Sequence, residues 1–397
     1  MTTSVPLIIV YLLLTTFLVV AGVLEKRSLK ENAKKINLRV NVNGIRGKST
    51  ATRFITAILE EAGYRVVGKT TGTSARLILW GRKREIEIRR RPVGPNIAEQ
   101  ITVLKTAARM KADALVCECM AVNPEYQSIY QHQIVQANVV VLTNVVEDHL
   151  DEMGPTTDQI AWAFGETIPY NGTLVITSGK YEDYFRRVAA QRNTQVVCVD
   201  PETEVDDAYL NEFPFMVFLN NCAIGLGFAR AMGIDDETAK RAMLKSHPDP
   251  GATQIVPVER DGKKCYLVNA FAANEPESSL EIMEKIRESK LPQQDSVLLL
   301  CCRDDRVDRS HQFVKDFLPY VQAKTLMVIG TGALEVIHDF KKGKYPGIED
   351  CVDLSGQKAD VIISEISELM NDNIVMCAGN IHGTAEEFLE EFAAIRI

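Results

Sequence analysis

The sequence predicts an α/β protein with two domains that follow one transmembrane helix at the N-terminus. Three observations predict this fold. Short β-branched runs alternate with amphipathic stretches of helical length, a loop with two glycines joins the first such run to the next helix, and the first charged residue is Glu25. Alternation of this kind is typical of a mostly parallel sheet covered by helices.

The apolar start predicts the membrane helix. Residues 6–24 read PLIIVYLLLTTFLVVAGVL, and a helix of this length spans roughly 28 Å, close to the hydrocarbon layer of about 30 Å. A cleaved signal peptide would need a basic start and a small-x-small cleavage site, and a buried core helix is rarely apolar on every face. We therefore expect a transmembrane anchor at 1–24. Residues 25–35, with five basic and two acidic side chains, would form a juxtamembrane linker on the cytoplasmic side of the cell membrane.

The composition is that of a folded protein with reduced cysteines. The 397 residues, 46% hydrophobic and 25% charged, suffice for two or three domains and exclude a disordered or disulfide-stapled chain. The 45 Lys and Arg against 53 Asp and Glu give a net charge of −8, which argues against nucleic acid as a partner. The nine cysteines are odd in number and lack zinc-finger spacing. Buried thiols in a reducing compartment are therefore expected.

Turn residues cluster at 247–251, where we place the boundary between domains at 36–250 and 251–397. A helix is predicted at 48–62. The charged run 82–91 indicates an exposed hairpin strand, with contact to an anionic polymer or lipid headgroups as the alternative. Strands are predicted at 36–43, 64–68, 114–119, 137–144 and 173–177 before the boundary, and at 264–270, 296–301, 325–329 and 374–377 after it.

Residues 43–50, NGIRGKST, predict a phosphate site. They follow a predicted strand and open a predicted helix, where free backbone N–H groups bind anions and glycines let phosphate oxygens approach. Lys48 would reach the β- and γ-phosphates, and the Ser49 hydroxyl would coordinate Mg²⁺. Val42 stands where the eight-residue P-loop has glycine, so the loop is a shortened form, G-x-x-G-K-S.

Two later segments supply carboxylates for such a site. Glu118 ends a predicted apolar strand, where a buried carboxylate needs a cation or several hydrogen bonds; an ordinary surface carboxylate is the alternative. Residues 143–154, TNVVEDHLDEMG, place four carboxylates and His149 just past another predicted strand. Ligands of α/β proteins bind at the carboxyl ends of strands, so we expect His149 to be functional rather than structural.

Taken in order, these motifs resemble those of the Mur ligase superfamily of ATP-dependent amide ligases. Residues 44–49 are similar to its G-T-x-G-K-[ST] loop, 143–151 to its T-N-…-D-H-L-D motif, and 379–383 to its closing G-K-G-H-E. The resemblance covers nearly everything after the anchor. It implies a P-loop central domain of Mur-ligase type, a C-terminal Rossmann-like domain, and ATP and Mg²⁺ as cofactors.

The resemblance also implies roles for individual residues. The implied catalytic residues are Lys48, Glu118 and His149. Residues implied to bind the nucleotide are Gly44, Arg46, Gly47, Lys48, Ser49, Thr50, Asn221, Asn274, Asp305 and Arg306, with Asn221 contacting adenine. Implied metal ligands are Ser49, Thr73, Glu118 and His149.

Departures from the superfamily pattern narrow the expected function. The phosphate loop begins some twenty residues after the anchor, so the domain that holds UDP-linked substrates in cell-wall ligases is missing, and Phe164 stands roughly where many members carry a carbamylated lysine. The chain is most similar to the branch of the superfamily that is membrane-anchored and polymerises glutamate. Segments 41–50, 118–127 and 303–309 carry this similarity.

The resemblance therefore implies repeated ligation of glutamate through its γ-carboxyl group, with an acyl-phosphate intermediate and release of ADP and phosphate. The implied partners are glutamate, the growing poly-γ-glutamate chain of a capsule or exopolymer, and integral-membrane subunits, because a single helix cannot form an export pore. A folyl-polyglutamate-type ligase, a membrane-tethered NTPase that energises export, and an inactive scaffold are the alternatives.

Overall fold

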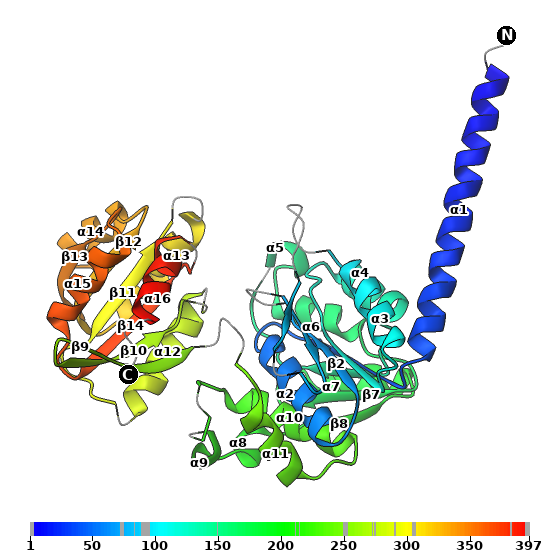
Figure 1. The fold of residues 1–397 in the computed structure, drawn as a ribbon, viewed down its shortest axis with the longest axis horizontal. Helices are drawn as coiled ribbons and strands as arrows, with labels where there is room; N and C mark the ends of the chain where they lie inside the picture. The colour runs from blue at the N-terminus through cyan, green and yellow to red at the C-terminus, as the bar shows by residue number, and fades with distance from the viewer. Residues whose placement is uncertain are drawn as a thin grey trace. The chain divides into compact units, whose positions relative to one another are not determined.

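A computed structural model describes the chain apart from residues 1–3, 72–74, 83, 89–95, 149, 211, 214, 249–252, 272, 274, 290, 304–306, 382 and 394–397. The chain divides into two compact units (Figure 1). The first comprises Met1–Phe213 and Val217–Asp249, and the second comprises Pro214–Met216 and Pro250–Ile397. Met216 belongs to the second unit because its amide donates to the carbonyl of Thr253 (3.1 Å).

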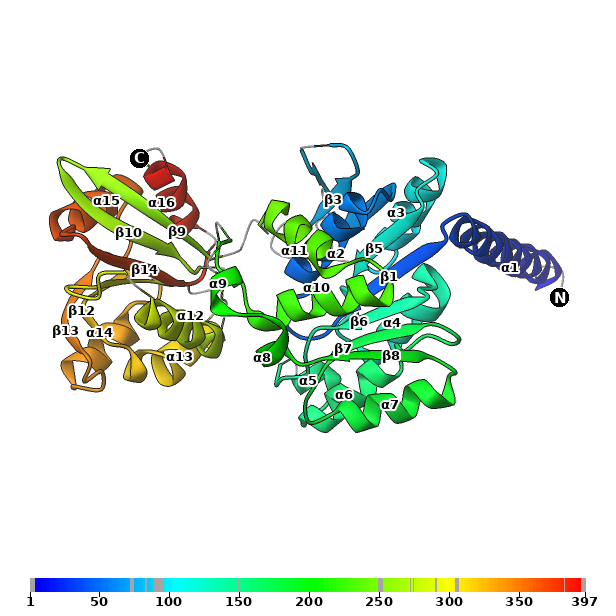
Figure 2. The same cartoon turned by 90° about the horizontal axis from the view of Figure 1, so that it is seen from below.

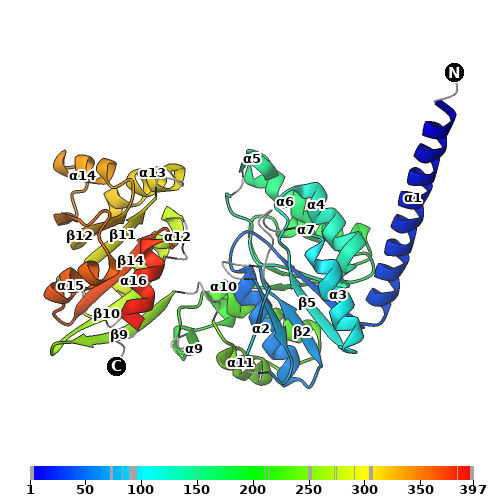
Figure 3. The same cartoon turned by 45° about the horizontal axis from the view of Figure 1, so that its top comes forward.

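The first helix, α1 (Ser4–Lys34), leaves the body of the first unit and points its N-terminal half away from it (Figures 1 and 3). Every residue from 8 to 27 is exposed, although most of them are apolar. In contrast, Leu29, Ala33 and Ile36 are buried among residues of the helices that cover the first sheet. The juxtamembrane linker at 25–35 stays a prediction; in the structure α1 continues through most of it, and the end of this helix is part of the core.

Arg39 fixes this helix end. Its guanidinium donates to the carbonyls of Ala33 (3.1 Å) and Ile36, and its Nε donates to the carbonyl of Gln136 (2.8 Å). A cation at the carboxyl end of a helix satisfies carbonyls that have no partner within the helix and opposes the negative end of the helix dipole. Burial lowers the pKa of Arg39 from its usual value. The last turns of α1 are thus rigidly joined to the first strand.

The first sheet has eight strands in the order β4-β3-β2-β5-β1-β6-β7-β8. The six strands from β2 to β8 in this order are parallel, and β3 and β4 add an antiparallel edge. The strands are β1 (Leu38–Asn43), β2 (Val66–Lys69), β3 (Arg76–Leu79), β4 (Ile86–Glu87), β5 (Ala114–Glu118), β6 (Val139–Leu142), β7 (Thr173–Thr177) and β8 (Gln195–Val199).

Helices cover both faces of this sheet, because alternate residues of each strand point to opposite sides. On β5, Ala114 and Val116 pack with α2 and α10, whereas Leu115 and Cys117 pack with α3 and the π-helical turn η1. The helices of this unit are α2 (Lys48–Glu61), α3 (Glu99–Arg109), α4 (Pro124–Ile129), η1 (Tyr130–Val135), α5 (Leu150–Met153), α6 (Thr157–Gly165), α7 (Glu182–Gln191), α8 (Pro201–Glu204), α9 (Asp207–Leu210), α10 (Leu219–Ala231) and α11 (Asp236–Lys245).

The second unit is built on a six-stranded sheet in the order β13-β12-β11-β14-β10-β9, parallel except for β9 at one edge. Helices α15 and α16 lie on one face, and α12 and α13 lie on the other (Figure 2). The strands are β9 (Gln254–Arg260), β10 (Lys263–Asn269), β11 (Val297–Cys302), β12 (Ala323–Gly330), β13 (Ile348–Asp353) and β14 (Asn373–Gly379). The helices are α12 (Pro276–Glu288), α13 (Val307–Asp316), the 3₁₀ turn η3 (Leu318–Tyr320), α14 (Leu334–Lys341), α15 (Ala359–Leu369) and α16 (Thr384–Ala393).

The α/β fold class is confirmed, with two differences in detail. The sequence did not predict β3 or the edge strands β8, β9 and β13; β13 carries three carboxylates, and β9 contains Pro257. In the charged run 82–91, of which residues 83 and 89–91 lie outside the described part, Glu85 is not simply solvated. It pairs with the buried Arg53 of α2 (Nη2–Oε2 3.0 Å).

Candidate active site

The phosphate loop, residues 44–47, connects β1 to α2 and needs glycine at both ends. Gly44 and Gly47 have φ values of +123° and +74°, which favour glycine. Packing imposes the same requirement, since a Cβ on Gly44 would collide with the Thr143 hydroxyl and one on Gly47 with the Asn221 amide. The loop shape therefore depends on its neighbours as well as on its own backbone.

Those neighbours come from the end of β6 and the start of α10. Asn144 brackets Arg46, accepting from its amide (3.0 Å) and donating to its carbonyl (3.2 Å), and the Thr143 hydroxyl donates to the same carbonyl (2.6 Å). The side-chain amide of Asn221 donates to the carbonyl of Gly47 (2.9 Å). The adenine contact expected of Asn221 stays a prediction. In this structure the side chain is buried and supports the loop.

Lys48 places a positive charge within the loop. Its Nζ donates to the carbonyls of Gly44 (2.8 Å) and Ile45 (2.7 Å), while its backbone begins α2. The N-terminus of a helix offers unpaired N–H groups and the positive end of the helix dipole. A lysine ammonium beside such a terminus makes an anion site that suits a polyphosphate. Thr50 follows in the same first turn.

Glu118, the last residue of β5, is buried and held by three different elements. Its Oε2 accepts from the Ser49 hydroxyl of α2 (2.8 Å) and from the amide of Thr71 after β2 (2.6 Å). The Tyr130 hydroxyl of η1 donates to its carbonyl (2.9 Å). The strand end thus presents a carboxylate directly beside the first turn of α2, as the sequence predicted.

The donor atoms at this point fit a hard divalent cation. A hydroxyl and a carboxylate are the oxygen ligands that Mg²⁺ and Mn²⁺ prefer, and they already lie within hydrogen-bonding distance of each other. Within the described residues, no group of three or more His, Cys, Asp or Glu side chains forms a metal cluster. Thr73 and His149, the other two predicted ligands, lie outside the described part of the chain.

Two cysteines flank Glu118 and remain neutral thiols. Burial is the main cause that raises the pKa of Cys117 to about 12 and that of Cys119 to about 11. All nine cysteines are free in the structure, and seven of them are buried, as the sequence predicted for most of them. The thiols beside Glu118 therefore add no negative charge to the site at neutral pH.

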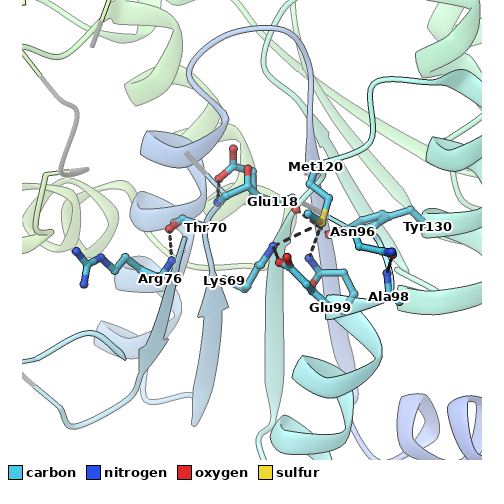
Figure 4. A network of polar contacts seen from close by, with 11 residues as sticks. Lys69, Thr70, Arg76, Asn96, Ala98, Glu99, Glu118, Met120 and Tyr130 are labelled. Atoms are coloured by element: carbon cyan, nitrogen blue, oxygen red, sulfur yellow. Dashed lines mark hydrogen bonds and ion pairs between the residues drawn. The ribbon is translucent and has the colours of Figure 1, made fainter. Parts of the chain in front are cut away.

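A buried lysine near the site was missed by the sequence analysis. Lys69, at the end of β2, is fully buried, and its Nζ lies 3.5 Å from the Glu99 carboxylate and 3.8 Å from the sulfur of Met120 (Figure 4). A buried ammonium requires such partners because leaving water costs it several kcal/mol, on the order of the penalty for any buried ion. The signal available in the sequence was a lysine at the end of a short apolar strand.

A pocket of about 580 Å³ opens beyond the end of β5. Asn123, which accepts from the amide of Glu125 (3.0 Å) and so caps α4, forms part of its wall. Asp151 and Glu152 of α5 contribute two exposed carboxylates to its rim. The lining residues are Asn96, Ile97, Met120, Ala121, Val122, Asn123, Tyr126, Asp151 and Glu152. The pocket therefore combines apolar walls with amide and carboxylate groups a few residues from Glu118.

The structure brings together the predicted residues of the first unit that it describes, namely Gly44, Arg46, Gly47, Lys48, Ser49, Thr50, Glu118 and Asn221. Phe164 is a buried core residue packed with Leu174 and Phe185, so it completes no metal site. Asn274, Asp305 and Arg306, predicted on the second unit, lie outside the described residues, and their roles stay predictions.

Comparison with known proteins places this fold and loop among the Mur ligases. Residues 42–218 match the Mur ligase middle domain, and residues 255–395 match the poly-gamma-glutamate synthase CapB C-terminal domain. The solved structure of E. coli FolC in complex with DHPP and ADP has the same fold (TM-score 0.62, 17% identity, 93% of this chain and 92% of that chain covered). The fold is thus that of ATP-dependent amide ligases.

Two relatives are similar over almost the whole chain. PGA synthase CapB of Bacillus subtilis is 45% identical over 380 residues, which cover 96% of each chain, and capsule biosynthesis protein CapB of Bacillus anthracis is 46% identical over 376 residues, 95% of this chain and 81% of that one. The chain therefore belongs to the CapB family, and its enzyme class is ATP-dependent amide ligase.

Proposed function

We propose that this protein polymerises glutamate through amide bonds to the γ-carboxyl group, using ATP. The observation that carries the proposal is the junction of Lys48, Ser49 and Glu118 at the phosphate loop, in a chain that belongs to the CapB family. A γ-carboxylate oxygen attacks the γ-phosphorus and ADP leaves, which gives an acyl phosphate. The amine of another glutamate then attacks the acyl carbon, phosphate leaves, and the amine loses a proton.

Charge neutralisation is the main task of the site. A carboxylate and a phosphate oxygen about 4 Å apart repel each other by roughly 4 kcal/mol at an intermediate dielectric constant. Lys48 and the N-terminus of α2 would offset this repulsion and stabilise the charge that moves during phosphoryl transfer. Mg²⁺, held by Ser49 and Glu118, would supply further positive charge to the β- and γ-phosphates.

Helix α1 supports a membrane location. It is the one helix among the described residues that is long and apolar enough to cross a bilayer, and its residues 8–27 are all exposed. Such an apolar surface is unfavourable in water. We propose a single membrane span followed by a cytoplasmic ligase, since Lys26, Arg27 and Lys30 follow the apolar stretch. Export of a polymer then requires integral-membrane partner subunits.

Hydroxylamine trapping tests the reaction. The full-length protein in detergent, given ATP, Mg²⁺, glutamate and hydroxylamine, should form γ-glutamyl hydroxamate and ADP in equal amounts. Lys48→Ala should abolish the product, whereas Lys180→Ala, a matched change of an exposed lysine, should leave it unchanged. ATP hydrolysis without any glutamate-dependent hydroxamate would contradict the proposal and favour an export NTPase.

A further inference from the structure

Three polar side chains enter the core between the first sheet and the helix pair α4–η1. Gln127, Tyr130 and Gln131 have the i, i+3, i+4 spacing that places them on one helical face, and all three are buried. Tyr130 donates to the carbonyl of Glu118, as described above. Gln127 and Gln131 each belong to a series of hydrogen bonds between amide groups, and the two series end at different parts of the fold.

The first amide relay begins in the phosphate loop. The amide of Gly44 donates to Asn43 Oδ1 (2.9 Å), Asn43 Nδ2 donates to Gln127 Oε1 (2.9 Å), and Gln127 Nε2 donates to the carbonyl of Val122 (2.8 Å). The three hydrogen bonds run in one direction, so each side-chain amide uses both of its ends. Val122 belongs to the wall of the 580 Å³ pocket. Gln127 therefore connects the phosphate loop to that wall.

The second amide relay begins at Asn41, two residues before Asn43 on β1. Asn41 Nδ2 donates to Gln131 Oε1 (2.9 Å), and Gln131 Nε2 donates to the carbonyl of Ala137 (2.9 Å). The Oδ1 atom of Asn41 has no hydrogen-bond partner among the described residues. This relay ends before β6 and reaches neither the loop nor the pocket.

Stability alone does not explain the first relay. A buried amide pair gains little net free energy over a well-packed apolar pair, because each amide first gives up its hydrogen bonds to water. A fully satisfied polar pair does fix the relative position of the two elements that carry it. In the first relay these elements are the strand that leads into the phosphate loop and the helix that follows the pocket wall.

We propose that Gln127 is a positioning residue, which holds the phosphate loop in register with the wall of the pocket beyond Glu118. Only the rates predicted below rest on the proposed ligase function. In that function the acceptor carboxylate must meet the γ-phosphate at a fixed distance, and the relay sets that distance. Gln131 has the same burial, the same partner type and the same helix face, and it serves the fold alone.

The two glutamines provide a matched experiment. Gln127→Leu and Gln131→Leu should lower the melting temperature by similar amounts. Gln127→Leu should lower kcat for hydroxamate formation at least tenfold while the Kd for ADP changes less than threefold, because small misplacements of reacting groups are costly but the anion site is left intact. Gln131→Leu should change both values less than threefold. Equal effects of the two variants on kcat would overturn the proposal.

A double variant separates positioning from folding. Asn43→Leu with Gln127→Leu removes the Asn43 Nδ2 group that the single variant leaves unpaired, so the melting temperature should recover in part; the amide of Gly44 and the carbonyl of Val122 still lose their partners. The defect in kcat should persist. Recovery of kcat together with stability would show that the relay is merely structural and would overturn the proposal.

Hydrogen exchange tests the relay without relying on catalysis. The amide of Gly44 should exchange at least tenfold faster in Gln127→Leu than in the wild type and should keep its wild-type rate in Gln131→Leu. Unchanged exchange in Gln127→Leu would overturn the proposal even if the protein is an active ligase. If the two variants show this exchange pattern but the wild type forms no hydroxamate, the ligase function is contradicted and the relay is not.

Discussion

The Ser49 hydroxyl lies 2.8 Å from the Glu118 carboxylate, so the first turn of α2 meets the end of β5 beside the phosphate loop. The two residues are 69 positions apart in the sequence. The parallel arrangement of β1 and β5 brings them together, because the carboxyl ends of parallel strands share one edge of the sheet.

Glu118→Gln should abolish most of the activity without unfolding the protein. The amide can still accept from Ser49 and Thr71, but it has no charge to hold a divalent cation. We expect at least a hundredfold slower hydroxamate formation, with partial recovery at high Mg²⁺ concentration. Glu125→Gln, at an exposed position of α4, is the control and should be fully active. Activity of Glu118→Gln within threefold of the wild type would exclude a role for this carboxylate.

Gly47→Ala should weaken nucleotide binding as well as stability. It adds about 1–3 kcal/mol of backbone strain at a positive φ and pushes Asn221 away from the loop. Gly63→Ala is the matched control, because Gly63 also has a positive φ (+88°) but open space around the added Cβ. Calorimetric titration with ADP should show lost affinity for the first variant alone. Similar affinities in both would contradict this account of the loop.

The Lys69–Glu99 pair should be a matter of stability. Lys69→Met leaves Glu99 without its buried cation, and we expect a loss of about 3 kcal/mol in the free energy of unfolding. Adding Glu99→Gln should restore part of this loss. Urea denaturation of the single and the double variant measures the free energy of unfolding. A single variant as stable as the wild type would show that other contacts already satisfy Glu99.

The thiols beside Glu118 should resist alkylation. Burial raises the pKa of Cys119 to about 11, so about a thousandth of it is thiolate at pH 8, and Cys117, at about 12, has still less. Because burial raises both pKa values, the reactivity of the two thiols should rise only as the pH approaches these pKa values or as the protein unfolds. Mass spectrometry after iodoacetamide treatment, with and without urea, checks this. Rapid modification of either thiol in the native protein would contradict the burial.

Truncation should separate the two parts of α1. Removal of residues 1–24 deletes residues 8–24, which are all exposed, so the protein should leave the membrane fraction and keep its melting temperature. Removal of residues 1–36 also deletes Leu29, Ala33 and Ile36 from the core and should lower the melting temperature markedly. Sedimentation and thermal unfolding of the two variants test this. Equal melting temperatures would show that the helix end does not support the domain.

The sequence predicted those parts of the fold that depend on local patterns. The central strands, such as β5 and β6, are short apolar runs bounded by polar residues, and the loop at 44–47 has two glycines before a lysine. The edge strands β8 and β13 were not predicted, because both are only partly buried and β13 carries three carboxylates among its six residues. The continuation of α1 through its basic end escaped it as well, since only packing shows that Leu29 and Ala33 are buried.

For the site, the sequence predicted the residues with chemical function but not those that position them. Glu118 and Ser49 were predicted from strand ends and loop composition. Gln127 was not, because nothing local distinguishes a buried glutamine on a short helix from an exposed one; its partner Asn43 lies 84 positions away. Thr71 contributes a backbone amide, which no side-chain pattern can reveal.

Oxygen transfer from substrate to phosphate tests the central claim most directly. Glutamate labelled with ¹⁸O in its γ-carboxyl group is incubated with ATP and the full-length protein in unlabelled water, and the released phosphate is analysed by mass spectrometry. An acyl phosphate leaves one ¹⁸O atom in each phosphate when the amine displaces it. Phosphate without label would mean that water, and not the γ-carboxylate, attacks ATP, and would contradict the proposed ligation.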